Sequence, residues 1–316
     1  MRKILTRPEF VPAVLLILAF IAGTIQSPYF LDVRYLLDST GPYAETGLLV
    51  IGLTFVIISG NIDLSVASNL AFVACATAKL AQIGLPMPAA ATIGVLIGGL
   101  LGAFNGALVA YAKLPSFLVT LGTLALFRGM AQALMGSASV QVPSSFVGAD
   151  RLDLPLLGVP LPFGIMIVFV VVLGLTLHRT IFGRWTFAVG TNEEAAFFAS
   201  VPTPAVKFRI FVLAGLLAGL AGVLIDSRLG VARFDHARGL ELEAITAVVL
   251  GGVSITGGRG SMIGSLLALL LIAVLKTQMI LANITSEVQL TVTGTLLIVA
   301  VAITGVATRL SAPRKA

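Results

Sequence analysis

Charged side chains are scarce in this sequence. Of its 316 residues only 11% are Asp, Glu, Lys or Arg, whereas 58% are hydrophobic, and the mean hydropathy is +1.06. A soluble domain carries roughly 25% charged residues because its surface must face water. This chain has too little polar surface to cover a water-soluble globule, so the composition predicts that lipid surrounds much of it.

Cysteine, histidine and aromatic residues are also few. The single cysteine, Cys75, lies in an apolar run, which excludes an internal disulfide and indicates a packing role. His178 and His236 are far apart and lack the spacing of metal ligands, so we predict no metal site. The net charge of +6 is not arranged as a basic stripe with interleaved aromatic residues, which argues against nucleic acid as a partner.

Motifs for catalysis and nucleotide binding are absent from the sequence. No Gly-x-x-x-x-Gly-Lys-Ser/Thr pattern occurs, and the nearest glycine-rich stretch, GGVSITGGRG at residues 251–260, lacks the lysine. Neither a serine nucleophile elbow nor a His-Glu-x-x-His pattern is present. We therefore expect no catalytic residues and no cofactor in this chain, which argues against an enzyme.

Long apolar runs dominate what is present. They predict an all-α, polytopic integral membrane protein with about ten transmembrane helices in one domain over residues 1–316. The segment 60–63 barely separates two runs, and residues 240–257 contain two glycine pairs, so one or two segments are broken or re-entrant. The candidate spans are 10–27, 43–59, 62–81, 88–111, 115–134, 161–178, 209–227, 240–257, 261–281 and 287–307.

Basic residues outside these spans indicate the orientation. With a cytoplasmic N-terminus, twelve fall on the cytoplasmic side and six outside, and this bias predicts that both termini are cytoplasmic in a bacterial inner membrane. Residues 136–160 then form an external loop, and residues 179–208 form a charged cytoplasmic loop. Arg228, Arg233 and Arg238 oppose the rule, and neighbouring acidic residues offset them.

Small residues recur at helical spacing in two of the runs. Gly98, Gly102 and Gly106 stand one turn apart, as do Gly215 and Gly219. Such faces let helix backbones approach closely in lipid. We interpret them as packing surfaces.

Four segments together resemble the ribose-type monosaccharide importer permeases. GNIDLSV at 60–66 is similar to the family's GGIDLSV signature, and LPSFLVTLGT at 114–123, with Arg128, is similar to its fifth-span motif. Residues 182–196 resemble the cytoplasmic loop that docks on the ATPase, and residues 239–252 resemble the segment before the ninth span. Asn61 stands where the family usually has glycine.

The resemblance implies a permease subunit of an ATP-driven (ABC) importer for a monosaccharide or a sugar-like signal such as rhamnose, ribose or autoinducer-2. It implies an ABC ATPase that carries ATP and Mg, a periplasmic sugar-binding protein, and a second permease subunit, either identical or different. A branched-chain amino-acid importer permease is one alternative. The other is an ion-coupled secondary transporter, which would need intramembrane carboxylates in symmetry-related halves.

Uncharged polar residues near the broken segments are candidates for the substrate pathway. Each could instead bond a neighbouring helix, and Asp63 could cap a helix rather than face a wet cavity. Arg128 either extends to the outer interface or pairs with a buried carboxylate. The candidate pathway residues are Asn61, Asp63, Asn69, Asn105, Thr120 and Thr123.

The cytoplasmic loop 179–208 contains a candidate ATPase-coupling element. Thr191 or Asn192 can cap a short helix with acidic residues in its first turn and two phenylalanines after them, before prolines stop it. The aromatic residues would anchor a protein interface or else lie in lipid. The candidate coupling residues are Gly190, Asn192, Glu193, Glu194, Ala195, Ala196, Phe197 and Phe198.

Overall fold

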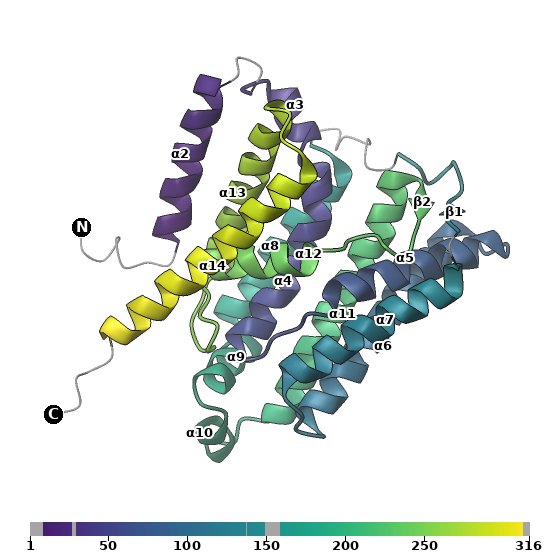
Figure 1. Cartoon of the computed structure of the whole chain (residues 1–316). Coiled ribbons are helices and arrows are strands. Elements are labelled where there is room, and N and C mark those ends of the chain that lie inside the picture. Colours follow the sequence, from purple (N-terminus) through teal and green to yellow (C-terminus); the bar gives the residue numbers. More distant parts are fainter. Residues whose placement is uncertain (1–8, 27–29, 137, 149–158, 312–316) are drawn as a thin grey trace.

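The computed structural model describes residues 9–26, 30–136, 138–148 and 159–311, and in these ranges the chain is almost entirely helical (Figure 1). The long helices lie side by side, and short helices and loops connect them at both ends. The first half contains α2 (Phe10–Gln26), α3 (Val33–Asp38), α4 (Gly41–Ile58), α5 (Val66–Gln82), α6 (Met87–Ala110) and α7 (Ser116–Met135). The second half contains α8 (Leu161–Arg179), α9 (Ile181–Thr191), α10 (Glu193–Phe198), α11 (Thr203–Leu229), α12 (Leu240–Leu250), α13 (Met262–Leu281) and α14 (Ser286–Ser311).

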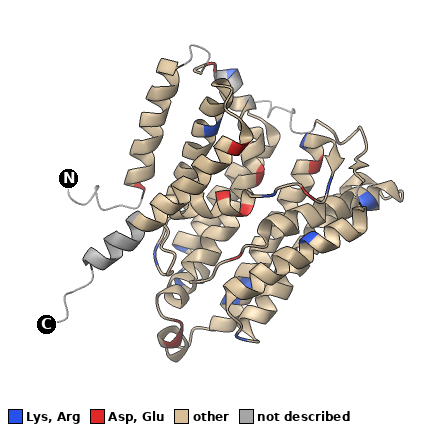
Figure 2. Cartoon of the chain, in the orientation of Figure 1, with Lys and Arg blue, Asp and Glu red and all other residues tan. Residues whose placement is uncertain are grey.

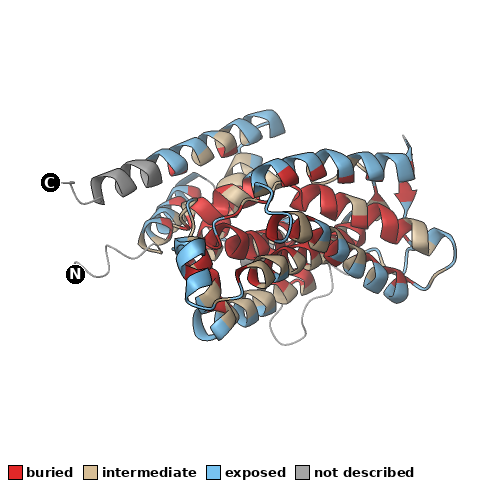
Figure 3. Ribbon diagram, turned by 90° about the horizontal axis from the view of Figure 1, so that it is seen from below, coloured by how far each residue is buried: buried red, intermediate tan, exposed pale blue. Residues whose placement is uncertain are grey.

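Helix α4 lies at the centre of the core and is buried along nearly its whole length. It packs against α8, α11, α12 and α13, and the outer helices keep one exposed apolar face, as Figure 3 shows. A helix that is apolar all round must be enclosed by protein or lipid. The arrangement therefore places α4 inside the protein and leaves the outer faces of α6, α7, α8 and α14 for lipid or a partner.

Glycine determines how closely α6 and α11 pack. A Cβ atom at Gly98 would lie 2.6 Å from the carbonyl oxygen of Gly215 and 2.7 Å from the Cα atom of Gly219. These distances leave no space for a side chain, so the two backbones are in direct contact. The interpretation of these glycines as a packing face is confirmed.

The predicted count of ten spans is not confirmed. Six of the described helices are long and apolar enough to cross a membrane, namely α4, α6, α7, α8, α11 and α13, and shorter apolar helices cover Phe10–Gln26 and Ser286–Ala302. Residues 240–257, one of the segments expected to be broken or re-entrant, are not one continuous helix, because α12 ends at Leu250 and a glycine-rich loop leads to Ser261. Residues 62–81 begin their helix only at Val66.

The two predicted loops contain more structure than expected. Residues 179–208 form α9, α10 and the first turns of α11. In residues 136–160, of which 137 and 149–158 lie outside the described part, β1 (Val140–Gln141) pairs antiparallel with β2 (Val231–Ala232). Val140 lies opposite Ala232 in this ladder. The strands hold this loop against the segment between α11 and α12. The hydropathy of the sequence did not predict this pairing.

Charge is sparse along the helices and gathers near their ends and in connections, as Figure 2 shows. This distribution is expected of helices that cross a low-dielectric medium, because an unpaired charge there is costly.

Candidate functional site

The chain between α4 and α5 is not helical over residues 59–65, although its polar side chains are buried. The Asn61 side-chain amide donates to the backbone oxygen of Ser59 at 3.2 Å and to its Oγ at 3.0 Å. Asp63 Oδ1 accepts hydrogen bonds from the backbone N–H of Ser65 at 2.8 Å and from its hydroxyl at 2.6 Å. The carboxylate thus closes the turn that leads into α5, but Ser65 rather than Asp63 stands at the N-cap of that helix.

Helices α6 and α7 hold this broken segment from the side. The backbone N–H of Ile62 donates to Ser116 Oγ at 3.2 Å, and the Thr120 hydroxyl donates to the Ile62 carbonyl oxygen at 3.2 Å. The Asn105 side-chain amide donates to Ser65 Oγ at 2.8 Å. Backbone groups that the break removes from helical pairing are therefore bonded by side chains, as membrane depth requires.

The remaining pathway candidates are buried and bonded to helices. The Asn69 side-chain amide donates to the Gly98 carbonyl oxygen at 3.0 Å, and Thr123 donates to the Thr120 carbonyl oxygen at 3.4 Å. The side-chain oxygens of Asn69 and Asn105 have no hydrogen-bond partner in the described residues. Four of the six candidates thus lie in the break or bond to it, whereas Asn69 bonds α6 and Thr123 bonds its own helix.

Helices α9 and α10 form the predicted cytoplasmic element. Asn192 ends α9 and caps α10, because its Oδ1 accepts the backbone N–H of Ala195 at 2.9 Å. Glu193 follows in the first turn and pairs with Lys207 of α11 at 2.5 Å. The cap and the acidic first turn are where the sequence predicts them, and the ion pair ties α10 to a membrane helix.

The two phenylalanines of α10 are the exposed part of this element. Phe197 is 60% exposed and Phe198 77% exposed, with ring centroids 6.0 Å apart, whereas Ala196 faces the core. Exposed neighbouring aromatic rings are unusual on a surface in water and are typical of interface anchors. The prolines act differently from the prediction, because the helix ends at Phe198 and Pro204 opens α11.

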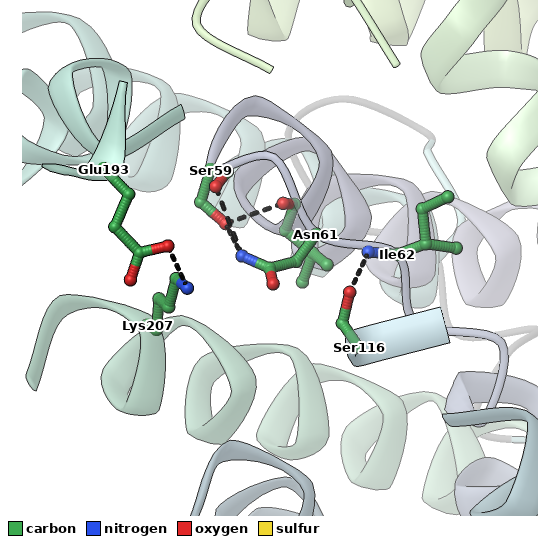
Figure 4. Close-up of polar contacts among 7 residues, drawn as sticks. Ser59, Asn61, Ile62, Ser116, Glu193 and Lys207 are labelled. Carbon is green, nitrogen blue, oxygen red and sulfur yellow. Dashed lines mark hydrogen bonds and ion pairs between the residues drawn. The ribbon is translucent and has the colours of Figure 1, made fainter. Parts of the chain in front are cut away.

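One of the pathway candidates, Asn61, and three of the coupling candidates line a common cavity of about 720 Å³, whereas the other candidates do not line it. Asn61 and Ser116 contribute from the break and from α7, and Glu193, Glu194 and Phe197 contribute from α10. Figure 4 shows the Glu193–Lys207 pair on one side, and on the other Asn61 bonded to Ser59 and Ser116 bonded to the backbone N–H of Ile62. Asn61 and Glu193, 132 positions apart in the sequence, thus line a single cavity.

Backbones from three segments meet next to this cavity. The backbone N–H of Gly258, in the loop after α12, donates to the carbonyl oxygen of Ile58 at the end of α4, at 2.8 Å. A Cβ atom at Gly190 of α9 would lie 2.6 Å from the Gly258 nitrogen, and one at Gly257 would lie 2.8 Å from the Cα atom of Gly60. We name Ile58, Gly60, Gly190, Gly257 and Gly258 the glycine junction. It joins α9 directly to both breaks in the fold.

Two buried ion pairs were not predicted as pairs. Arg228 donates from Nε and Nη2 to the two carboxylate oxygens of Glu45 at 2.8 and 2.7 Å. Lys276 in α13 pairs with Glu243 in α12 at 2.5 Å, and the Glu243 side chain is only 5% exposed. Glu243 is therefore more than a charged helix start, and the signal was the lysine inside an apolar span, which requires a partner.

Arg128 binds backbone rather than the buried carboxylate that the sequence offered as one partner. Its Nη1 donates to the carbonyl oxygens of Phe234 and His236 at 2.7 and 2.6 Å. In the same connection Arg233 pairs with Asp235, and this hydrogen bond lowers the pKa of Asp235 to about 2. The arginine holds the connection between α11 and α12 against α7.

Potential metal ligands do not gather in the described residues, where no group of three His, Cys, Asp or Glu side chains lies within reach of one ion. His178 Nε2 accepts the backbone N–H of Met262 at 3.3 Å, which links α8 to the start of α13. Cys75 is buried.

Comparison with known proteins identifies the family. Residues 36–301 match the family model described as branched-chain amino acid transport system / permease component. The chain belongs to this permease family. It is 37% identical over 300 residues to the autoinducer 2 import system permease protein LsrD of Photorhabdus temperata, with 93% of this chain and 90% of the relative covered.

Two further relatives agree with this result. LsrD of Escherichia coli K12 is 37% identical over 300 residues, and that of Photorhabdus laumondii is 36% identical over 298 residues, with the same coverage. No solved structure matches the chain significantly. The chain is thus a permease subunit of an ABC importer, a multi-pass membrane protein and a transport subunit in which ATP hydrolysis belongs to a partner ATPase.

Proposed function

We propose that the chain is one of two permease subunits of an importer for autoinducer-2 or a similar small sugar-like molecule. The observation that carries the proposal is the shared cavity, in which the broken segment after α4 meets the exposed coupling helix. A partner ATPase that displaced α10 would act directly on the cavity that Asn61 of the broken segment lines. Such a contact is what a transport subunit without a nucleotide site needs.

The chemistry around the break favours a neutral hydroxylated substrate. Five of the six pathway candidates are uncharged amides or hydroxyls, and the sixth, Asp63, has one carboxylate oxygen engaged by Ser65. Buried amides with free oxygens at Asn69 and Asn105 can accept hydrogen bonds from hydroxyl groups. The names of the relatives agree with this class of substrate, and the name of the family model supplies the competing one, a branched-chain amino acid.

The proposed partners follow from the same arrangement. An ABC ATPase, which holds ATP and Mg, would receive Phe197 and Phe198, and a periplasmic binding protein would deliver the substrate to the opposite side. A second permease chain, identical or different, would cover part of the exposed apolar helices. In this orientation both termini and α9–α10 are cytoplasmic, although residues 1–8 and 312–316 lie outside the described structure.

Reconstitution tests the function. The chain, its ATPase, its partner permease and its binding protein are placed in proteoliposomes, and uptake of labelled autoinducer-2, ribose, rhamnose and leucine is measured. We expect uptake of at least one of the sugar-like molecules, dependent on both ATP and the binding protein. Uptake of leucine and of none of the sugar-like molecules would show that the substrate is a branched-chain amino acid. Transport by this chain alone on a proton or sodium gradient would refute the ATP-driven mechanism.

Cysteine labelling tests the orientation. Ser144 and Ser200 are both exposed; Ser144 follows β1 and Ser200 follows α10, and these two elements lie at opposite ends of the helices in Figure 1. With Cys75 replaced, an impermeant maleimide added to whole cells should label Ser144→Cys and leave Ser200→Cys unlabelled. The reverse pattern would place α10 outside, away from any ATPase.

A further inference from the structure

A second cavity lies between α12, α13 and α14, away from the coupling helices. Its volume is about 300 Å³, at the lower end of the roughly 300–1,000 Å³ typical of small-molecule sites. Lys276 lines it and follows the start of α13 at Met262 by fourteen residues, or about 21 Å of helix. The cavity therefore lies toward the end of α13 that, in the proposed orientation, faces the side where the binding protein would release its substrate.

A buried carboxylate oxygen in this cavity lacks a partner. Glu243 Oε2 accepts from Lys276 at 2.5 Å, but Glu243 Oε1 has no hydrogen bond to any described residue. Leaving a buried charged acceptor unsatisfied costs more than a typical hydrogen bond contributes. A donor that the protein itself does not provide is therefore expected at this oxygen.

The other groups around the cavity define the class of that donor. Lys276 balances the charge of Glu243, so the buried pair is neutral as a whole. Thr246 and Thr293 donate to carbonyl oxygens of their own helices and keep acceptor capacity. Arg238 stands at the rim, exposed and over the ring of Phe234 at 5.7 Å. Glu243 would repel an anion and Lys276 would repel a cation, so the arrangement favours a ligand without net charge.

We propose that Glu243, Lys276 and the inner face of α14 bind a small neutral polyol, with a ligand hydroxyl donating to Glu243 Oε1. The inference rests on the proposed function and adds a contact site for its substrate at the entry side of the permease. A polyol satisfies both members of the pair, because each hydroxyl can donate to the carboxylate and accept from the ammonium group. The site would receive the substrate before it reaches the break at residues 59–65.

Thiol protection detects binding without altering the ion pair. Gln289 lines the cavity and is half-buried, whereas Thr291, two residues further along α14, is exposed and does not line it. In the permease–ATPase complex with Cys75 replaced, autoinducer-2, ribose or rhamnose should slow methanethiosulfonate modification of Gln289→Cys by at least about 5-fold. Modification of Thr291→Cys should not change.

A charge-balanced double variant tests the chemistry. Glu243→Gln with Lys276→Met should raise the polyol concentration for half-protection of Gln289→Cys by about 10-fold or more, since a hydrogen bond to a carboxylate is lost. The matched control, Glu45→Gln with Arg228→Met, removes the other buried pair, whose two carboxylate oxygens are both bonded, and should leave this concentration unchanged.

The outcomes separate this site from the proposed function. If the native complex imports one of the three polyols but none of them protects Gln289→Cys, the cavity is not a polyol site and the importer assignment stands. If Glu45→Gln with Arg228→Met weakened protection as much as the Glu243–Lys276 double variant, the effect would reflect a general loss of stability. That result would also refute the site. If the native complex imports none of the three, the proposed function fails and the site fails with it.

Discussion

The α6–α11 contact and the glycine junction both bring backbones together at glycine, yet they join different kinds of structure. At the α6–α11 contact two uninterrupted helices meet, and every backbone group there can bond within its own helix. At the junction the end of α9 meets two non-helical segments, and a backbone hydrogen bond crosses from Gly258 to Ile58. Close packing of intact helices resists change of shape, whereas the non-helical segments at the junction lack the regular hydrogen bonds of a helix. We therefore expect the first contact to act as scaffold and the second to move during transport.

The largest effect is expected from breaking the scaffold. Gly98→Ile would force a branched side chain into the carbonyl group of Gly215, and overpacking of this kind costs about 3 kcal/mol of stability. We expect a lower melting temperature and little monodisperse protein in detergent. Gly129→Ile is the control, because no atom lies within 4 Å of a Cβ there. Equal behaviour of the two variants would show that α6 and α11 do not need close contact.

A single methyl group at the junction should impair transport more than folding. A Cβ atom at Gly190 would overlap the carbonyl oxygen of Ile58 and lie 2.6 Å from the Gly258 nitrogen, so Gly190→Ala must separate α9 from α4 and from the loop after α12. We expect membrane insertion with a lowered melting temperature, and uptake per inserted complex reduced about 10-fold or more while ATP hydrolysis by the complex continues. Uptake at the native rate would mean that the junction transmits no movement.

The two exposed phenylalanines of α10 should matter for ATPase binding and not for the stability of the chain. Replacing Phe197 and Phe198 with alanine removes two exposed rings, so the isolated chain should be as stable as before. Association with the ATPase should weaken by about 2 kcal/mol or more, as for aromatic anchors in interfaces, and uptake should cease. Ile181→Ala, also exposed, is the matched control on α9. Normal co-purification and uptake by the double variant would exclude α10 as the coupling element.

Much of the helical fold could be predicted from apolar runs, because a backbone in lipid must form its hydrogen bonds within its own segment. Most predicted bounds agree with the helices to within a few residues, and the Asn192 cap was predicted from local chemistry alone. The two glycine pairs in residues 240–257 indicated a broken segment, but the apolar run did not locate the break, and the helix ends at Leu250. Hydropathy measures affinity for an apolar medium, and buried loop and buried helix are equally apolar.

The site was harder to predict because it depends on contacts over long separations. The sequence named Asn61 and Glu193 for separate reasons, and nothing in a single chain places them around one cavity. Ser116 was missed because a hydroxyl at a helix start is ordinary, and its bond to Ile62 is visible only in three dimensions. The Glu243–Lys276 pair was within reach, since a lysine in an apolar run demands a counter-charge.

The smallest expected effect tests how firmly α10 must be held. Asn192→Ala removes the acceptor for the Ala195 N–H, and loss of such a cap costs about 1 kcal/mol of helix stability. A six-residue helix has little else to hold it locally, so amide exchange in residues 193–199 should quicken about 5-fold, while uptake falls only a few-fold because the Glu193–Lys207 pair remains. Thr180→Ala is the comparison at the start of α9, where the cap is longer at 3.3 Å and the helix has eleven residues, so exchange there should change less. Faster exchange in α10 with uptake unchanged would show that coupling does not need the Asn192 cap. Movement would then reach the glycine junction through α9 alone.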